Sequence, residues 1–173
     1  MTVAELDRLP EPQAGEVLRA CCGASRWIEG MIGRRPFRDQ ESLLASASEV
    51  WQGLETGDWK EAFANHPRIG ESEAVRPQNF RGKAWSAAEQ AQVSEATPAI
   101  RQALAEVNRQ YEARFGYTYI VCADGRTPGD LLGSARARLQ NDPESELRVA
   151  ANEQLTITLL RLRRLLTPLT PNP

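Results

Sequence analysis

The sequence predicts an all-α fold, a single compact domain of several helices with one short extended segment near the candidate site. Apolar residues recur at intervals of three and four along most of the chain, which places them on one face of a helix. A cap residue followed by proline, a frequent helix start, occurs at Thr97-Pro98, Thr127-Pro128 and Asp142-Pro143. Residues 117–122 differ, because their aromatic and β-branched side chains favour extended backbone.

Length and composition indicate one soluble domain in the cytoplasm. The 173 residues are 41% hydrophobic and 25% charged, as in ordinary globular proteins. A net charge of -2 argues against nucleic acid as the main partner. No signal peptide and no membrane-spanning apolar stretch is recognisable. We expect a helical domain over 1–166 and a flexible, proline-rich tail over 167–173.

Helix signals begin at the first residues. Thr2 and Glu5 have the spacing of a capping box, which opens a short helix that must end before Pro10. A second helix is expected from residue 14 to residue 22. Ser25 is the candidate cap of a third helix.

Two further caps precede a long stretch without clear periodicity. Asp39 precedes apolar residues at helical spacing, and Asp58 is the candidate cap of a short helix leading to His66. Residues 65–85 then lack clear periodicity, and a loop of this length is usually functional or disordered. The apolar positions behind Asp39 are Leu43, Leu44, Ala47, Val50, Trp51 and Leu54.

The second half of the chain has the strongest helix signals. The helix that starts at Thr97-Pro98 has its expected end at Gly116. The last helix is expected from Asp142-Pro143 to about Leu166. The extended residues 117–122 lie between these helices and have no obvious strand partner. Their backbone groups therefore need other partners, for which a polar ligand is one candidate.

His66 is the only histidine of the chain, and its side chain has an unperturbed pKa near neutrality. Pro67 disfavours helical backbone at His66 and restricts its own φ, so the imidazole is expected on a stiff loop. Such a loop can direct the side chain at a substrate. A lone histidine is also often only a polar surface residue.

Ser86 and Glu89 have the spacing of a second capping box. In that position the free N–H groups of Ala87 and Ala88, together with the helix dipole, favour a bound anion such as a substrate carboxylate. This interpretation places Glu89 close to the reacting atoms of a bound substrate.

The sequence gives no indication of a metal or an organic cofactor. Its three cysteines include an adjacent pair and no CxxC motif, so neither a disulfide framework nor a zinc site is expected. Phosphate-binding and dinucleotide-binding glycine motifs are missing. Cys122 lies between two small apolar residues and is interpreted as a packed side chain, not a nucleophile.

Several segments together resemble the 2-oxo-4-hydroxy-4-carboxy-5-ureidoimidazoline (OHCU) decarboxylase family. Each motif is weak alone, but they occur in the family's order and spacing over nearly the whole chain. They are His66-Pro67-Arg68-Ile69-Gly70, Ser86-x-x-Glu89-Gln90, the run from Arg114 to Ala123, Gly125-Arg126-Thr127, the run from Asn141 to Leu147, and Leu160-Arg161-Leu162.

The resemblance implies an all-α homodimer that decarboxylates the ureidoimidazoline to (S)-allantoin without a cofactor, in urate catabolism. It implies that His66 is the family's essential histidine, and from the chemistry of the substrate we expect His66 to be the general acid/base, acting with Glu89 as a hydrogen-bond acceptor for the substrate. Arg161 is expected to offer its planar donor fork to a substrate carboxylate or ring carbonyl. Together with the helix start expected at Ser86, this gives as expected substrate-binding residues Pro67, Ser86, Ala87, Ala88, Glu89, Gln90, Tyr119, Ile120, Val121, Cys122, Ala123 and Arg161.

Two alternatives stay open at this point. Tyrosines at 117 and 119, where the family usually has phenylalanine, are compatible with the same fold acting on a related ureido-imidazoline. The chain is also compatible with a non-catalytic helical binding module, in which Trp27, Leu43 and Trp51 form a partner face rather than core.

Overall fold

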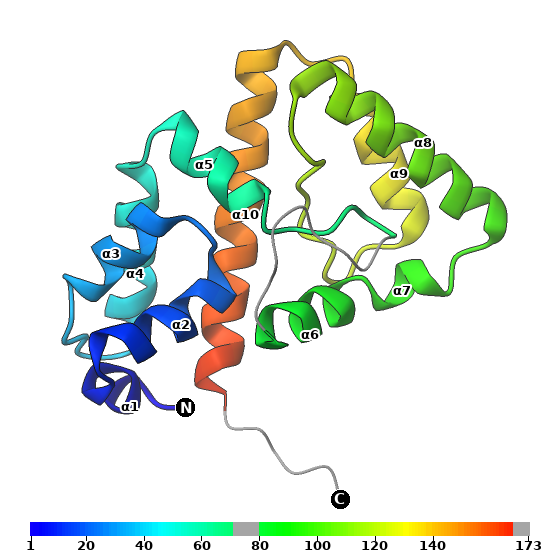
Figure 1. The fold of residues 1–173 in the computed structure, drawn as a ribbon. Helices are drawn as coiled ribbons and strands as arrows, with labels where there is room; N and C mark the ends of the chain where they lie inside the picture. Colours follow the sequence, from blue (N-terminus) through cyan, green and yellow to red (C-terminus); the bar gives the residue numbers. More distant parts are fainter. Residues whose placement is uncertain (71–79, 168–173) are drawn as a thin grey trace, which may run out of the picture.

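A computed structural model describes residues 1–70 and 80–167 and confirms the all-α prediction. The described residues contain helices and connecting segments but no β-strand. The long helix α10 (Pro143–Leu166) crosses the middle of the molecule, with α1–α5 on one side and α6–α9 on the other (Figure 1). No helix in these residues is long and apolar enough to cross a membrane.

The helices follow one another through short connections, and α10 packs directly against α2, α4 and α5. On the other side, α8 packs against α9. In chain order before α10 they are α1 (Val3–Arg8), α2 (Glu11–Cys21), α3 (Ser25–Ile32), α4 (Gln40–Gln52), α5 (Thr56–Phe63), α6 (Phe80–Glu89), α7 (Ala91–Ser94), α8 (Pro98–Phe115) and α9 (Pro128–Arg138).

Most of the predicted caps are confirmed. The hydroxyl or carboxylate of each accepts the backbone N–H three residues on, which satisfies one of the free donors of the first turn. Gly116 ends α8 with φ 76°, in the left-handed conformation that glycine adopts without strain. The confirmed caps are Thr2, Asp39, Thr97, Thr127 and Asp142.

Two predicted caps are wrong. Ser25 is the first residue of α3, not its cap, and its N–H and hydroxyl donate to the carboxylate of Glu61 in α5 at 3.1 and 2.9 Å. Asp58 lies three residues inside α5, where it accepts the N–H of the true cap, Glu55, at 2.9 Å. Both side chains form hydrogen bonds near a helix start, but the cap position belongs to another residue, Ala24 for α3 and Glu55 for α5.

The core lies between α10 and the surrounding helices. Trp27 is fully buried and its indole N–H donates to the carbonyl of Ala47 at 3.1 Å, which joins α3 to α4. Trp51 and Leu43 are buried in the same cluster. These side chains are therefore core, which removes the partner face proposed for a binding module.

A buried ion pair joins α9 to α10 beneath the extended segment. Arg138 donates to Oε1 of Glu146 through Nε at 2.8 Å and through Nη2 at 2.6 Å, and Glu146 is fully buried. The Tyr111 hydroxyl and the Asn141 amide also donate to the Glu146 carboxylate. Every charged atom of this pair is thus hydrogen-bonded, as burial of charge requires.

Replacing Arg138 by Met is expected to destabilise the protein by about 3–5 kcal/mol, because the buried Glu146 carboxylate loses its counter-charge. The measurement is the free energy of unfolding in urea. Arg148→Met is the control, since Arg148 and its partner Glu144 have side chains 71% and 79% exposed and such pairs contribute at most about 1 kcal/mol. Equal losses in the two variants would contradict the assignment.

Candidate active site

The extended segment is held by side chains rather than by a neighbouring strand. Residues 117–123 have no regular secondary structure, as predicted. The Ile120 carbonyl accepts from Arg138 Nη1 at 2.8 Å, and the Cys122 N–H donates to Glu153 of α10 at 2.7 Å. These two backbone groups therefore need no ligand as partner.

The loop after α5 is fixed at several points. Arg68 forms a two-fold hydrogen bond with Glu112 of α8 at 2.7 and 2.8 Å. The Ile69 carbonyl accepts from the buried Asn108 amide at 3.0 Å, and the Gly70 N–H donates to Gln90 at 2.8 Å. The stiff loop expected for His66 is thus anchored to α8 and to the end of α6.

The second capping-box prediction is wrong. Helix α6 starts at Phe80, so Ser86 and Glu89 lie at its C-terminal end, and the N–H of Gln90 still donates to the Ser86 carbonyl at 3.2 Å. Ala87 and Ala88 are exposed residues in the body of the helix, where amide groups bond within the helix. They do not form the anion-binding helix start that the sequence suggested.

The side chains of Ser86 and Glu89 instead bind a buried arginine of α10. Arg161 donates to Glu89 Oε1 through Nε at 3.0 Å and to Oε2 through Nη2 at 2.8 Å. Nη2 also donates to the Ser86 hydroxyl at 3.0 Å, and Nη1 donates to the Ala20 carbonyl at 3.3 Å. The guanidinium is therefore occupied by protein groups.

A second arginine extends this network to the turn after the extended segment. Arg164 donates to Glu89 Oε1 at 3.2 Å and to the Asp124 carboxylate at 2.6 Å. The Glu89 side chain is only 9% exposed. Two cations thus hold one carboxylate at the edge of the pocket.

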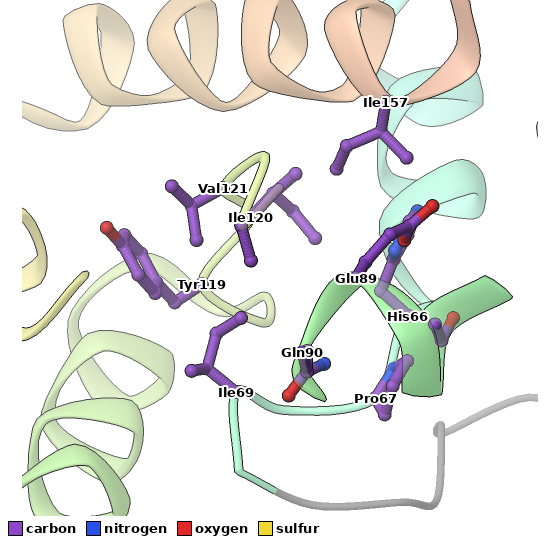
Figure 2. A pocket seen from close by; sticks show the side chains of 11 residues that line it. His66, Pro67, Ile69, Glu89, Gln90, Tyr119, Ile120, Val121 and Ile157 are labelled. Carbon is purple, nitrogen blue, oxygen red and sulfur yellow. The ribbon is translucent and has the colours of Figure 1, made fainter. Parts of the chain in front are cut away.

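His66 and Glu89 meet in a small pocket between the loop, the end of α6, the extended segment and α10 (Figure 2). The space between its lining residues is about 330 Å³ when the part open to solvent is included. The lining residues are His66, Pro67, Ile69, Ser86, Glu89, Gln90, Tyr119, Ile120, Val121, Ala123 and Ile157.

Most of the predicted binding residues line this pocket, but Ala87, Ala88, Cys122 and Arg161 do not. Arg161 is bonded to Ser86 and Glu89 and is not one of the lining residues, so its direct contact with a ligand stays a prediction. Ile157 was not singled out as a site residue, although it lies four residues before Arg161, on the same face of α10.

His66 is buried, and this burial, assisted by the positive charge of Arg161, lowers the pKa of its imidazole from 6.5 to about 3. The imidazole is consequently neutral near pH 7. A hydrogen-bonding interaction with Gln154 favours the protonated form but does not offset the other two effects. His66 can thus accept a proton, and it cannot serve as an acid until it has done so.

Two other predicted residues are clarified by their surroundings. The ring of Tyr119 lines the pocket, but its phenol oxygen is directed away from His66 and Glu89 (Figure 2). The hydroxyl that distinguishes it from phenylalanine therefore does not narrow the space for a ligand. Burial raises the pKa of the Cys122 thiol, as expected for a packed side chain rather than a nucleophile.

Within residues 1–70 and 80–167, no group of three or more His, Cys, Asp or Glu side chains is placed to hold a metal ion. The fold and site define a class: an all-helical protein with a small pocket, equipped for proton transfer by a neutral imidazole beside an arginine-bound carboxylate.

The chain belongs to the OHCU decarboxylase family, whose model matches residues 7–163. It is 34% identical over 149 residues to a uric acid degradation bifunctional protein of Arabidopsis thaliana, covering 85% of this chain and 45% of that protein. It is 29% identical to the 2-oxo-4-hydroxy-4-carboxy-5-ureidoimidazoline decarboxylase of Amia calva, covering 75% of this chain and 73% of that protein. The chain thus spans less than half of the bifunctional relative.

Solved structures agree with this membership. A crystal structure of OHCU decarboxylase in the presence of (S)-allantoin is similar with a TM-score of 0.75 and 30% identity, over 87% of this chain and 97% of that chain. A structure of (S)-allantoin synthase is similar with a TM-score of 0.70, over 95% of this chain and 54% of that chain. At 18% identity, the second likeness concerns the fold alone.

His66 is expected to show no titration in the folded protein between about pH 8 and pH 5, because its pKa is about 3. Imidazole NMR signals measure this directly, and in urea they should titrate near the ordinary value of about 6.5. Because the unfolded chain then binds a proton that the folded chain does not, the free energy of unfolding falls as pH decreases from about 6.5 toward 3, by up to about 1.4 kcal/mol per pH unit.

His66→Asn should lose this part of the pH dependence of stability. A folded-state midpoint close to the value in urea would contradict the buried, neutral imidazole.

Proposed function

We propose that this protein decarboxylates 2-oxo-4-hydroxy-4-carboxy-5-ureidoimidazoline to (S)-allantoin in urate catabolism. The observation that supports this most directly is the meeting of His66 and Glu89, from two distant motifs, in one small pocket. Family membership over residues 7–163 supports the reaction class.

The chemistry of this substrate suits a site made of protein side chains. One ring carbon has both the carboxylate and the hydroxyl group, and its neighbour is the carbon of a C=N bond. When the bond to the carboxylate breaks, its electron pair moves into this imine, which acts as an internal electron sink. The protein must then orient the carboxylate, take the hydroxyl proton, and direct a proton to the neighbouring carbon from one face. Positioning can contribute several kcal/mol, up to roughly 7–11 in the best cases.

His66 is the proposed base for the hydroxyl proton. A neutral imidazole has a lone pair for this proton, and burial keeps it neutral at physiological pH. Once protonated, the same imidazole is a strong acid because its pKa is low, so it returns the proton readily. Proton transfer by a positioned group contributes on the order of 10²–10⁴ in rate.

Glu89 is the proposed acceptor for a hydroxyl or ureido N–H group of the substrate. Its position is fixed by Arg161 and Arg164, whose charges also reduce the repulsion that a free carboxylate would exert on an anionic substrate. Arg161 thus acts through Glu89 and Ser86. The backbone of residues 119–123 and the Gln90 side chain complete the orientation of the ring.

The first test follows the reaction by circular dichroism, with urate oxidase and hydroxyisourate hydrolase generating the unstable substrate in place. Wild-type protein should produce a rapid and lasting (S)-allantoin signal. His66→Asn should reduce the rate to that of spontaneous decay, and Glu89→Gln should lower it by about 10²-fold or more, since each removes a group placed for proton transfer.

Glu106→Gln is the matched control, because Glu106 lies on the exposed surface of α8 and accepts hydrogen bonds from the nearby side chains of Arg109 and Gln110. It should react like wild type, and far-UV spectra should show all variants folded. If wild type leaves the slow formation of racemic allantoin unchanged, the substrate assignment is wrong.

We further propose a homodimer in the cytoplasm; of the tail expected over 167–173, residues 168–173 lie outside the described residues. Thr167 is still the C-terminal cap of α10. The family resemblance supports the dimer, and the free cysteines at positions 21, 22 and 122 agree with a reducing compartment. Sedimentation equilibrium should give twice the chain mass of 19.2 kDa; a monomer at micromolar concentration would refute the dimer.

A further inference from the structure

Gln154 is a fully buried amide in the middle of α10. It lies three residues before Ile157, which lines the pocket, and it interacts with the imidazole of His66 within hydrogen-bonding range. It is not one of the residues that line the pocket. Any effect of this amide on the chemistry must therefore act through His66.

The orientation of the amide follows from Thr158, one turn further along α10. The Thr158 hydroxyl donates its only proton to the Gln154 backbone carbonyl at 2.9 Å. Its oxygen can then only accept, and the group at 3.3 Å from it is Nε2 of Gln154. The amide oxygen, Oε1, is buried and has no well-formed hydrogen bond within the described part of the chain. This leaves an acceptor beside an imidazole that has an N–H to donate.

We propose, on the basis of the proposed function, that Gln154 is a positioning residue whose Oε1 accepts the N–H of neutral His66 and thereby keeps the other ring nitrogen unprotonated as the base. A neutral imidazole has two tautomers, and the partner of one nitrogen decides which is present. In the wrong tautomer the nitrogen needed as base already has a proton.

The charges around His66 explain why an amide suits this position better than a carboxylate. Arg161 of α10 already disfavours the protonated imidazole, and the Glu89 carboxylate, which lines the same pocket, is bound by Arg161 and Arg164. A carboxylate in contact with the imidazole would favour its protonated form. An amide oxygen selects the tautomer while adding no charge, so the imidazole stays neutral.

The experiment uses the single histidine of the chain, because every imidazole signal of an untagged protein belongs to His66. Nitrogen NMR at neutral pH should show one protonated and one unprotonated ring nitrogen in wild type. Gln154→Met keeps the length of the side chain and removes the acceptor. We expect a mixture of tautomers, a kcat about 10²-fold lower and little change in KM, since the base rather than substrate binding is impaired.

Gln154→Glu should act as the conservative rescue. It restores an acceptor and hence the single tautomer, while its charge raises the pKa of His66 and adds an acid limb to the pH profile of kcat. Thr158→Val is a second route to the same test, because it releases the Gln154 amide without changing that residue. It should also give mixed tautomers.

Thr156→Val is the matched control on the same helix. Its exposed hydroxyl donates to the Asn152 carbonyl at 3.0 Å, so the variant loses one side-chain hydrogen bond far from the imidazole. It should leave tautomer and kcat unchanged. A single wild-type tautomer that persists in both Gln154→Met and Thr158→Val, with normal kcat, would overturn the proposal. A tautomer that depends on Gln154 in a protein without decarboxylase activity would overturn only the proposed function.

Discussion

The pocket depends on one buried guanidinium. Arg161 in α10 binds Glu89 and Ser86 at the end of α6 and the Ala20 carbonyl near the end of α2, so it ties together helices from both sides of α10 (Figure 1). The two side chains of this ion pair are only 4% and 9% exposed. Burying their charges costs several kcal/mol in lost hydration. A buried ion pair is weak evidence for stability, and what the structure shows of this pair is the fixed position that it gives to Glu89.

The same arginine constrains the chemistry of His66. Burial and the charge of Arg161 both disfavour a protonated imidazole, so the site at rest has a base rather than an acid. Arg161 and Arg164 also compensate the negative charge of Glu89. Three features expected separately from the sequence, a histidine, a glutamate and an arginine, are thus one electrostatic unit.

What could be predicted from the sequence depended on the range of the interactions. Caps such as Asp39 and Thr97 involve residues three apart, so a local pattern was sufficient. Ser86 and Glu89 have the spacing of a capping box but lie inside a helix, where residues three apart also share one face. Only the position of α6, which already includes Phe80, distinguishes such a pair from a cap. The bond from Arg138 to Ile120, and the placing of Arg161 beside Glu89, arise from packing of distant segments. Local patterns in the sequence do not specify such contacts.

The extended segment, residues 117–123, shows why a helical fold keeps one non-helical segment at its site. In a helix the backbone N–H and C=O groups bond to each other, whereas in extended backbone successive residues present them to opposite sides. The Ile120 carbonyl and the Cys122 N–H are bound on one side by Arg138 and Glu153. Val121, which lies between them, lines the pocket. Charged side chains thus hold the backbone on either side of a pocket-lining residue, whereas a helix in the same place would bind these backbone groups internally.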